Sequence, residues 1–306
     1  MDIVITYVNG ADPVWQEEYR RTLSVPPIVK RYRDFDTLKY LLRGIETNMP
    51  FIKNVFLVVS SESQVPAWAD LENLKVVLHR DIIPPQYLPT FNSTTIELFL
   101  HRIPGLAEEF IYFNDDIFPV LPCRPEDFFR DAKAVLGFRR CLFCTGQFRR
   151  HTRNSDRMAR KALSVGTESG IRAPKTFLRP QHTATTMLKS QSEAAFRSVA
   201  KELEACITPV REDCNINQYF FLDYQKLSGR AIDESLSNKH FSLASAGERS
   251  LRRFFASPTR KLVGINDTKM SPAKTALMQR LIPELLEEKF PVKSKYENLN
   301  YEPQEN

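Results

Sequence analysis

Two adjacent carboxylates interrupt an apolar stretch of the sequence. The β-favouring run FIYF at residues 110–113 leads directly into Asn114, Asp115 and Asp116, and apolar residues resume at Ile117. Asn and Asp are frequent in turns, so a plain turn is one interpretation. Hard cations such as Mg²⁺ prefer carboxylate oxygens, and a cation would offset the cost of desolvating two charges. The pattern therefore predicts either a turn or a metal site at the end of a strand.

A second polar group follows the first expected strand. The run from Asp2 to Val8 is rich in β-favouring residues and ends in the turn sequence NGADP at residues 9–13. Ligands of open α/β sheets bind outside the carboxyl ends of strands. Both the 9–12 segment and the 114–116 segment follow such ends, which favours the metal interpretation.

The elements that must position these residues alternate along the first half of the chain. The run NVFLVVS, which begins at Asn54, is nearly continuously apolar, as is typical of a strand covered on both faces. The predicted fold class is α/β, with a Rossmann-like sheet, helices on both faces and a helical second half. An open α/β sheet with paired carboxylates after a strand suggests a nucleotide-sugar transferase (GT-A-like) sheet, in which a cation would neutralise the pyrophosphate of the donor. In the first half we expect strands over residues 2–8, 54–60, 74–78 and 109–113, and helices over 14–23, 37–45 and 93–101.

The second half is predicted to be less regular. Ser271 and Pro272 form a favoured helix start, and Pro283 is expected to kink or restart that helix. Further helices are expected over residues 184–203 and 215–227 and a strand over 133–138, while 149–176 should be loop-rich and 293–306 a loose tail. We predict one catalytic domain over 1–292, with a nucleotide-sugar half (1–120), a variable basic insertion (121–175) and a helical half (176–292).

Composition narrows the class of protein. The 306 residues are 42% apolar and 26% charged, which is typical of a soluble globular protein. The absence of GxGxxG, GxxxxGK[ST] and GxSxG motifs argues against dinucleotide oxidoreductases, P-loop enzymes and α/β-hydrolases. Five cysteines without a regular framework indicate a reducing compartment, and the lone pair Cys141 and Cys144 is expected in a strand rather than on zinc.

A basic segment accounts for much of the net charge of +6. Residues 139–161 contain eight Arg or Lys and a single acid, Asp156. The segment is either a solvated loop or a surface for an anionic polymer, a phosphorylated acceptor or acidic lipid. We expect acceptor recognition. The first residues lack a basic leader, and no run approaches the roughly 18–20 apolar residues of a spanning helix, so we expect a cytoplasmic protein with peripheral contact at the inner face of the membrane.

Several stretches resemble the motifs of the Stealth family. The segment DIVITYVNGADPVW, residues 2–15, is similar to the first motif, and the run from residue 31 to 60, continued through VPAW, HRDIIP and NDD, to the second. RPQHTATTMLKSQ and VREDCNINQYF match the third motif more weakly, and residues 265–297 match the fourth. The resemblance covers nearly the whole chain apart from roughly residues 120–175 and 230–260. This family comprises capsular polysaccharide phosphotransferases of bacteria, with animal relatives in the α/β precursor of lysosomal-enzyme N-acetylglucosamine-1-phosphotransferase.

The resemblance implies a bacterial sugar-1-phosphate transferase. Its donor would be a nucleotide diphosphate sugar such as UDP-N-acetylhexosamine, and its acceptor a hydroxyl of a growing capsular or cell-surface polysaccharide. A nucleoside monophosphate would leave. The implied cofactor is Mg²⁺ or Mn²⁺, and the implied partners are the donor, the glycan acceptor and other capsule-assembly proteins, without nucleic acid.

Matching positions carry the family's roles into this sequence. Glu97, Asp116, His182 and Arg211 fall on its functional residues, and a hydroxyl acceptor requires a base such as His182. The metal would be held by Asp116 with Asp115 or Asp267, and the nucleotide and its phosphates by Asn9, Gly10, Asp12, Arg31, Arg33 and Arg43. This chain departs from the family pattern at Tyr7, where Trp is frequent, and at Asn215 or Asn217, where an acid is frequent.

Other interpretations stay open for these residues. Glu97 could pair with His101 or Arg102, a lone histidine is usually structural, and the arginines at 31, 33 and 43 could form a solvated face. Two other functions remain. A metal-dependent glycosyltransferase would release a nucleoside diphosphate, and a non-enzymatic polyanion-binding protein would show steep salt dependence without turnover.

Overall fold

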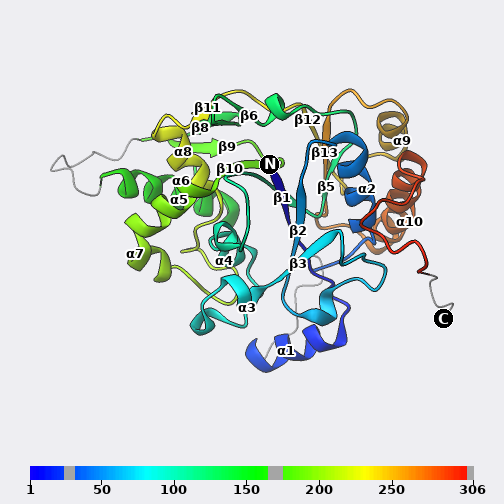
Figure 1. Ribbon diagram of the computed structural model, residues 1–306, viewed down its shortest axis with the longest axis horizontal. Coiled ribbons are helices and arrows are strands. Elements are labelled where there is room, and N and C mark those ends of the chain that lie inside the picture. Colours follow the sequence, from blue (N-terminus) through cyan, green and yellow to red (C-terminus); the bar gives the residue numbers. More distant parts are fainter. Residues whose placement is uncertain (24–31, 165–174, 302–306) are drawn as a thin grey trace. The chain divides into compact units, whose positions relative to one another are not determined.

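The computed structural model describes residues 1–23, 32–164 and 175–301 (Figure 1). The chain forms two compact units whose segments alternate along the sequence, so neither unit is one continuous stretch. Unit 1 comprises residues 1–4, 79–112 and 125–236, and unit 2 comprises residues 5–78, 113–124 and 237–306. This division does not follow the expected boundaries at 120 and 175, and a single catalytic domain stays a prediction.

Unit 1 contains one end of the main sheet and most of the short helices. Strand β4 (Glu109–Asn114), of which residues 109–112 belong to this unit, lies between the start of β1 (Asp2–Thr6) and the antiparallel β10 (Thr185–Leu188). Two smaller sheets follow the orders β11-β7-β6 and β8-β9. Their strands are β6 (Phe129–Arg130), β7 (Lys133–Val135), β8 (Phe138–Cys141), β9 (Phe177–Pro180) and β11 (Ala231–Ile232). The helices are α3 (His79–Ile82), α4 (Ser93–Glu97), α5 (Gln147–Ser164), α6 (Lys189–Ser198), α7 (Ala200–Glu204) and α8 (Tyr219–Leu227).

Unit 2 contains the parallel strands that follow β1. The end of β1 neighbours β2 (Asn54–Val59), which pairs in parallel with β3 (Leu74–Leu78). A second sheet has the order β12-β13-β5, in which β12 (Asn238–Ser242) is parallel and β5 (Ile117–Pro119) antiparallel to β13 (Leu262–Asn266). The helices are α1 (Pro13–Leu23), α2 (Leu38–Asn48), α9 (Glu248–Ala256) and α10 (Pro272–Lys289). The α/β fold class with parallel strands is thus confirmed.

Hydrophobic patterning explains why the first half was predictable. Residues 55–59 of β2 are almost completely buried, as their continuous apolar run requires. Helix α2 buries its apolar residues Leu38, Leu41, Leu42 and Ile45 at helical spacing. The expected strands over 2–8, 54–60, 74–78 and 109–113 correspond to β1, β2, β3 and β4.

Two expectations for the second half are wrong. Residues 185–188 form strand β10 instead of a helix start, and the expected loop after residue 149 is largely the 18-residue helix α5. Helix α5 buries small, mostly polar residues at helical spacing, which hides its inner face from a hydrophobic count: His151, Thr152, Ser155, Asp156, Ala159 and Ala162. Helix α10 is one helix through Pro283, so it does not restart there, and a kink at this residue stays a prediction.

The predicted loose tail is packed as far as it is described. Tyr296 accepts a main-chain hydrogen bond from Asp70 at 2.9 Å, and the amide of Asn298 donates to the oxygen of Trp68 at 2.7 Å. Glu297 is 4% exposed and forms an ion pair with Arg43 at 2.8 Å. A polar sequence does not predict these contacts, because they join residues far apart in the chain. Within the described ranges, no helix is both long and apolar enough to cross a membrane.

Candidate active site

Glu97 is the buried centre of a polar cluster in unit 1. It ends α4, which Asn92 caps by accepting a hydrogen bond from the amide of Thr94, and it is 5% exposed. The Glu97 carboxylate accepts from the main-chain amide of Gln218 at 3.0 Å, and the side-chain amide of Gln218 donates to it as well when its nitrogen faces the carboxylate. Burial raises the pKa of Glu97 to about 7, although the bonds from Gln218 and Ser93 and the charge of Arg211 oppose the rise.

Arg211 joins this cluster through a serine. Its guanidinium donates to the hydroxyl of Ser93 at the start of α4, and Ser93 is also a hydrogen-bond partner of Glu97. Arg211 itself is exposed, so its remaining donors face solvent or a ligand. The expected alternative partners of Glu97, His101 and Arg102, are not the ones found: His101 instead pairs with Glu193 at 3.1 Å.

His182 completes the cluster on its other side. The residue after Gln218 is Tyr219, whose buried hydroxyl lies 3.4 Å from Nδ1 of His182. The ring of Phe148 meets both His182 and Tyr219 edge-on, at centroid distances of 6.0 and 5.9 Å. The structure therefore brings three predicted residues, His182, Arg211 and Glu97, into one chain of contacts within unit 1. We call this set the Glu97 cluster: Ser93, Glu97, Arg211, Gln218, Tyr219 and His182.

Helix α5 holds the loop that carries Arg211. One face of α5 directs polar side chains at main-chain oxygens of residues 211–217. The bonds are Gln147 to Arg211 at 3.3 Å, His151 to Glu212 at 2.6 Å, Asn154 to Asp213 at 2.9 Å and to Asn215 at 3.2 Å, and Ser155 to Asn217 at 3.4 Å. Because Nε2 of His151 faces a carbonyl, this nitrogen carries the proton. The basic segment is therefore in part a scaffold for the Arg211 loop.

The neutral side chains of Asn215 and Asn217 stabilise the loop by hydrogen bonds. The Asn215 amide donates to the oxygen of Cys206 and to the Thr208 hydroxyl, both at 2.8 Å. Its carbonyl oxygen accepts from the amide of Glu212 at 2.7 Å and from Asn92 at 3.0 Å. An amide can donate and accept at once, whereas a carboxylate could not make the donated bonds.

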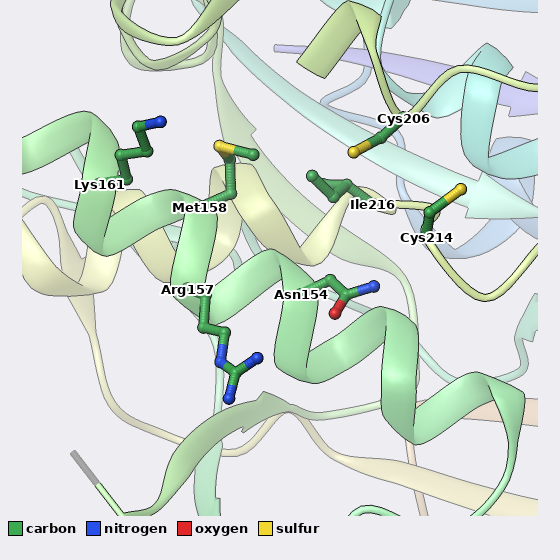
Figure 2. Close-up of a pocket in the computed structure, with 7 residues that line it drawn as sticks. All are labelled: Asn154, Arg157, Met158, Lys161, Cys206, Cys214 and Ile216. Carbon is green, nitrogen blue, oxygen red and sulfur yellow. The ribbon is translucent and has the colours of Figure 1, made fainter. Parts of the chain in front are cut away.

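A cavity of about 310 Å³ separates α5 from the base of the same loop (Figure 2). Its lining consists of Asn154, Arg157, Met158 and Lys161 from α5 and Cys206, Cys214 and Ile216 from the loop. In Figure 2 Met158 points toward Cys206, whereas the guanidinium of Arg157 turns away from the loop. Side-chain packing is therefore incomplete here, and hydrogen bonds from α5 side chains to main-chain oxygens hold the loop.

The Asp116 turn, residues 114–117, is the second candidate site and lies in unit 2. Asp115 and Asp116 form the turn before β5, and the amide of Ile265 in β13 donates to the Asp116 oxygen at 2.8 Å. Both residues are half-buried. The Oδ1 atom of Asp116 is shielded from solvent and meets no hydrogen-bond donor within the described ranges. Burial raises the pKa of Asp115 to about 8, with repulsion from Asp116 and Asp34 adding to it, and burial raises that of Asp116 to about 7.

These two carboxyl groups fit a cation. A shielded carboxylate oxygen without a donor is poorly stabilised as an anion, and a divalent ion would supply the missing positive charge. Asp267 is not added to them as a third ligand. Its two oxygens accept hydrogen bonds from Nη1 of Arg33, at 3.0 and 3.3 Å, and no group of three acidic, histidine or cysteine ligands occurs in the part of the chain that the structure describes.

The loop after β1 is held from within unit 2. Asp12 accepts bonds from the Ser63 hydroxyl at 2.6 Å, the Gln64 amide at 2.7 Å and the amide of Val14 at 3.0 Å. Burial opposes ionisation of Asp12, but these bonds keep its pKa below the usual value. Asn9 exchanges two bonds with Gln64, at 2.7 and 3.2 Å. The two predicted polar residues thus shape the loop.

Gly10 lies so close to the main chain of Tyr32 that a side chain would not fit. Its amide donates to the oxygen of Tyr32 at 3.0 Å, and a Cβ atom on Gly10 would lie 2.3 Å from that oxygen. The close approach predicted for this glycine is therefore made to the chain itself. Nearby, the Tyr7 hydroxyl donates to Asp34, and burial followed by the Asp34 charge raises the pKa of Tyr7.

Arg43 does not join these sites. The Arg43 guanidinium is 7% exposed and donates to both oxygens of Glu297 at 2.8 Å, to Glu287 at 3.1 Å and to the main-chain oxygen of Phe290 at 2.8 Å. These buried bonds make it a framework residue, contrary to the expectation of nucleotide binding. Arg31 lies outside the described residues.

Sequence reasoning missed several members of the sites. Ser93, Gln218 and Tyr219 of the Glu97 cluster, together with Phe148, were not singled out. The Gln218-Tyr219 pair lies inside the quoted VREDCNINQYF motif, and Ser93 lies between HRDIIP and NDD in the stretch that resembles the second motif, so membership of a motif was the available signal. Phe148 lies in the basic segment, where no such signal exists.

Parts of the chain are similar to known proteins. Residues 31–136 match the family described as Stealth protein CR2, conserved region 2. The receptor polysaccharide phosphotransferase WefC of Streptococcus oralis is 41% identical over 140 residues, which cover 43% of this chain and 42% of that protein. The capsular polysaccharide phosphotransferase cps1A of Actinobacillus pleuropneumoniae is 32% identical over 220 residues, covering 66% of this chain and 58% of that protein.

The chain thus spans less than half the length of WefC. Among solved structures, a galactosyltransferase LgtC in complex with donor and acceptor sugar analogs is similar at 12% identity and a TM-score of 0.44, covering 96% of this chain and 98% of that one. This likeness is too distant to add to the fold described above.

Proposed function

We propose that the chain is an enzyme of the Stealth family, whose conserved region 2 matches residues 31–136, and that it transfers a sugar 1-phosphate in capsule or cell-surface polysaccharide synthesis. The donor is a nucleotide diphosphate sugar, which we propose to be a UDP-N-acetylhexosamine, and the acceptor is a polysaccharide hydroxyl. The observation that supports this most is the Glu97 cluster, which joins residues of separate family-like motifs in one chain of contacts.

The reaction replaces one phosphoric anhydride with a phosphodiester. The acceptor oxygen attacks the phosphorus attached to the sugar, the bond to the nucleoside monophosphate breaks, and the proton of the hydroxyl passes to His182. Arg211 offers a bidentate fork to the transferred phosphoryl oxygens. Glu97 positions Ser93 and, through it, Arg211. The sugar C1–O bond stays intact, so the anomeric configuration is retained.

The acids of unit 2 would hold the cation. Asp116 and Asp115 would bind Mg²⁺ or Mn²⁺, which when bound neutralises the donor pyrophosphate. The Asn9–Asp12 loop and Arg33 would line the donor, while Arg43 stays in the framework. We propose a reducing, cytoplasmic location, because the five cysteines of the sequence do not form a regular disulfide framework.

The released nucleotide tests this function against its closest rival. The chain is incubated with Mg²⁺, an acceptor glycan and a panel of nucleotide sugars, and the products are weighed by mass spectrometry. A nucleoside monophosphate supports phosphotransfer, whereas a diphosphate would show that the protein is a glycosyltransferase. Binding to anionic polymers without any turnover would show a polyanion-binding protein instead.

A pH dependence should follow from Glu97. Its ionised form holds Ser93 and Arg211, and its pKa is about 7, so kcat of the wild type should rise as pH passes through about 7. Glu97→Gln should lose this inflection and, as a disrupted positioning group, fall on the order of 10²-fold in kcat. The control is Glu204→Gln, an exposed acid of the same unit. An unchanged pH profile in Glu97→Gln would assign the inflection to another group.

The support of the Arg211 loop by α5 should be measurable in catalysis. Asn154→Ala removes two donors to the loop, so kcat should fall about tenfold, because a displaced arginine fork stabilises the transition state less well. Donor KM should change little. Arg157→Ala is the matched control, because that side chain turns away from the loop (Figure 2). Equal losses in both variants would indicate general damage to α5.

A further inference from the structure

Exposed apolar side chains gather where β8 passes into α5. Leu142 is 56% exposed and Phe143 71% exposed, and both lie in the turn between the two elements. Phe148, in the first turn of α5, is 42% exposed. Three of the seven large exposed apolar residues of the described chain therefore fall within seven positions. Single exposed apolar residues are ordinary, but a gathered set indicates an interaction surface.

Positive charge surrounds these side chains. Arg139 and Arg140 in β8 are exposed, and Arg149 donates to the main-chain oxygen of Phe143 at 3.3 Å, which ties the tip to α5. The β8–β9 register, with Cys141 opposite Phe177, carries the exposed Lys175 toward the same end of the strand pair. No acid occurs between residues 138 and 155, and the nearest one in the segment, Asp156, is buried against Arg160.

We propose that this tip, residues 139–143, docks on an anionic lipid surface. Leu142 and Phe143 would enter the interfacial layer, while the arginines and Lys175 meet acidic headgroups. Apolar insertion and attraction of basic residues to acidic lipid act together in such contacts.

The tip is close in sequence to a residue that packs on the proposed base, which gives the lipid contact a role in catalysis. Phe148, a few residues further along, packs on His182 and Tyr219, so the docking surface and the Glu97 cluster are consecutive along one segment of unit 1. A lipid-linked acceptor would be presented beside the proposed base. This role rests on the proposed function, whereas the docking itself does not.

Vesicle sedimentation tests the docking without any substrate. The wild type should bind vesicles of phosphatidylglycerol mixed with phosphatidylcholine at least tenfold more tightly than phosphatidylcholine alone, since each basic residue at an anionic surface contributes about fivefold. Leu142→Ser with Phe143→Ser should weaken binding about tenfold, because the two apolar side chains that would insert into the lipid interface are lost. Arg139→Gln with Arg140→Gln should weaken it roughly 20-fold. Leu71→Ser, at a residue 62% exposed in unit 2, is the matched control and should bind like the wild type.

A fluorescent reporter separates insertion from surface attraction. Phe143→Trp should add an emission that shifts to the blue with acidic vesicles, relative to the same spectrum of the wild type. No vesicle binding, no blue shift, or full binding by the serine double variant would each overturn the proposal. Release of nucleoside monophosphate is measured in parallel. Intact turnover without vesicle binding overturns only the docking, and vesicle binding without turnover overturns only the transferase.

Discussion

Asp116→Asn is expected to abolish transfer while making the metal-free protein more stable at pH 8. The wild-type side chain has an oxygen shielded from solvent that meets no donor in the described structure, and its pKa is raised to about 7 by burial. Above that pH the folded protein must hold a poorly solvated anion. An amide removes this charge, which should raise the free energy of unfolding on the order of 1–3 kcal/mol.

The sign follows from proton linkage. The carboxyl groups of Asp115 and Asp116 have folded pKa values of about 8 and 7, above those of the unfolded chain, so the folded state binds more protons between pH 4 and pH 8. Their contribution to stability therefore falls as pH rises through this window. Thermal unfolding in excess chelator at pH 5 and pH 8 measures it, and the gain in Asp116→Asn should appear only at pH 8.

Magnesium provides the second measurement. The ion should raise the melting temperature of the wild type at pH 8 but not that of Asp116→Asn, because a ligand that binds only the folded state stabilises it. Asp131→Asn is the control, since Asp131 is exposed in a turn with φ of 51° that asparagine tolerates. Retained turnover, or destabilisation of Asp116→Asn at pH 8, would count against the metal site.

His182→Ala is expected to lose turnover by roughly 10²–10⁴-fold with donor affinity almost unchanged, as for removal of a general base. The imidazole lies 3.4 Å from the Tyr219 hydroxyl and against Phe148, outside the residues proposed to hold the donor. Donor binding is followed by titration and kcat by release of nucleoside monophosphate.

Added imidazole supplies the control for this variant. A small base can occupy the space of the missing ring and should restore part of the turnover of His182→Ala, but none of that of Asp116→Asn. If donor affinity collapses while kcat survives, His182 binds the donor and the base is another residue.

Apolar patterning explains which elements could be predicted. Strands β2 and β3 and helix α2 bury runs of Val, Leu and Ile whose spacing is visible in one sequence. Helix α5 was missed because the residues that it buries are mainly Ser, Thr, His and Asp, which satisfy hydrogen bonds rather than avoid water. The packed tail was missed because its polar sequence contains no apolar pattern. Its anchor is the ion pair of Glu297 with Arg43, which is distant in the sequence.

The site residues were predicted from motif resemblance, not from apolar patterning. Motif resemblance located Glu97, Arg211 and His182, which the structure joins in one cluster, and it located the Asp115 and Asp116 pair. Motif resemblance could not distinguish Arg33 from Arg43. Arg33 is partly exposed and pairs with Asp267, whereas the donors of Arg43 are used in the interior. That difference depends on partners more than 200 positions away, which no local pattern contains.

The bonds from α5 to the Arg211 loop do not depend on the side chains of Glu212 and Cys214, which are therefore open to evolutionary change. Gln147, His151, Asn154 and Ser155 all reach main-chain oxygens, which every amino acid possesses. Substitutions at Glu212 or Cys214 would therefore keep these bonds and the path of the loop. New acceptor preferences could arise at such positions by single mutations, without first losing the placement of Arg211.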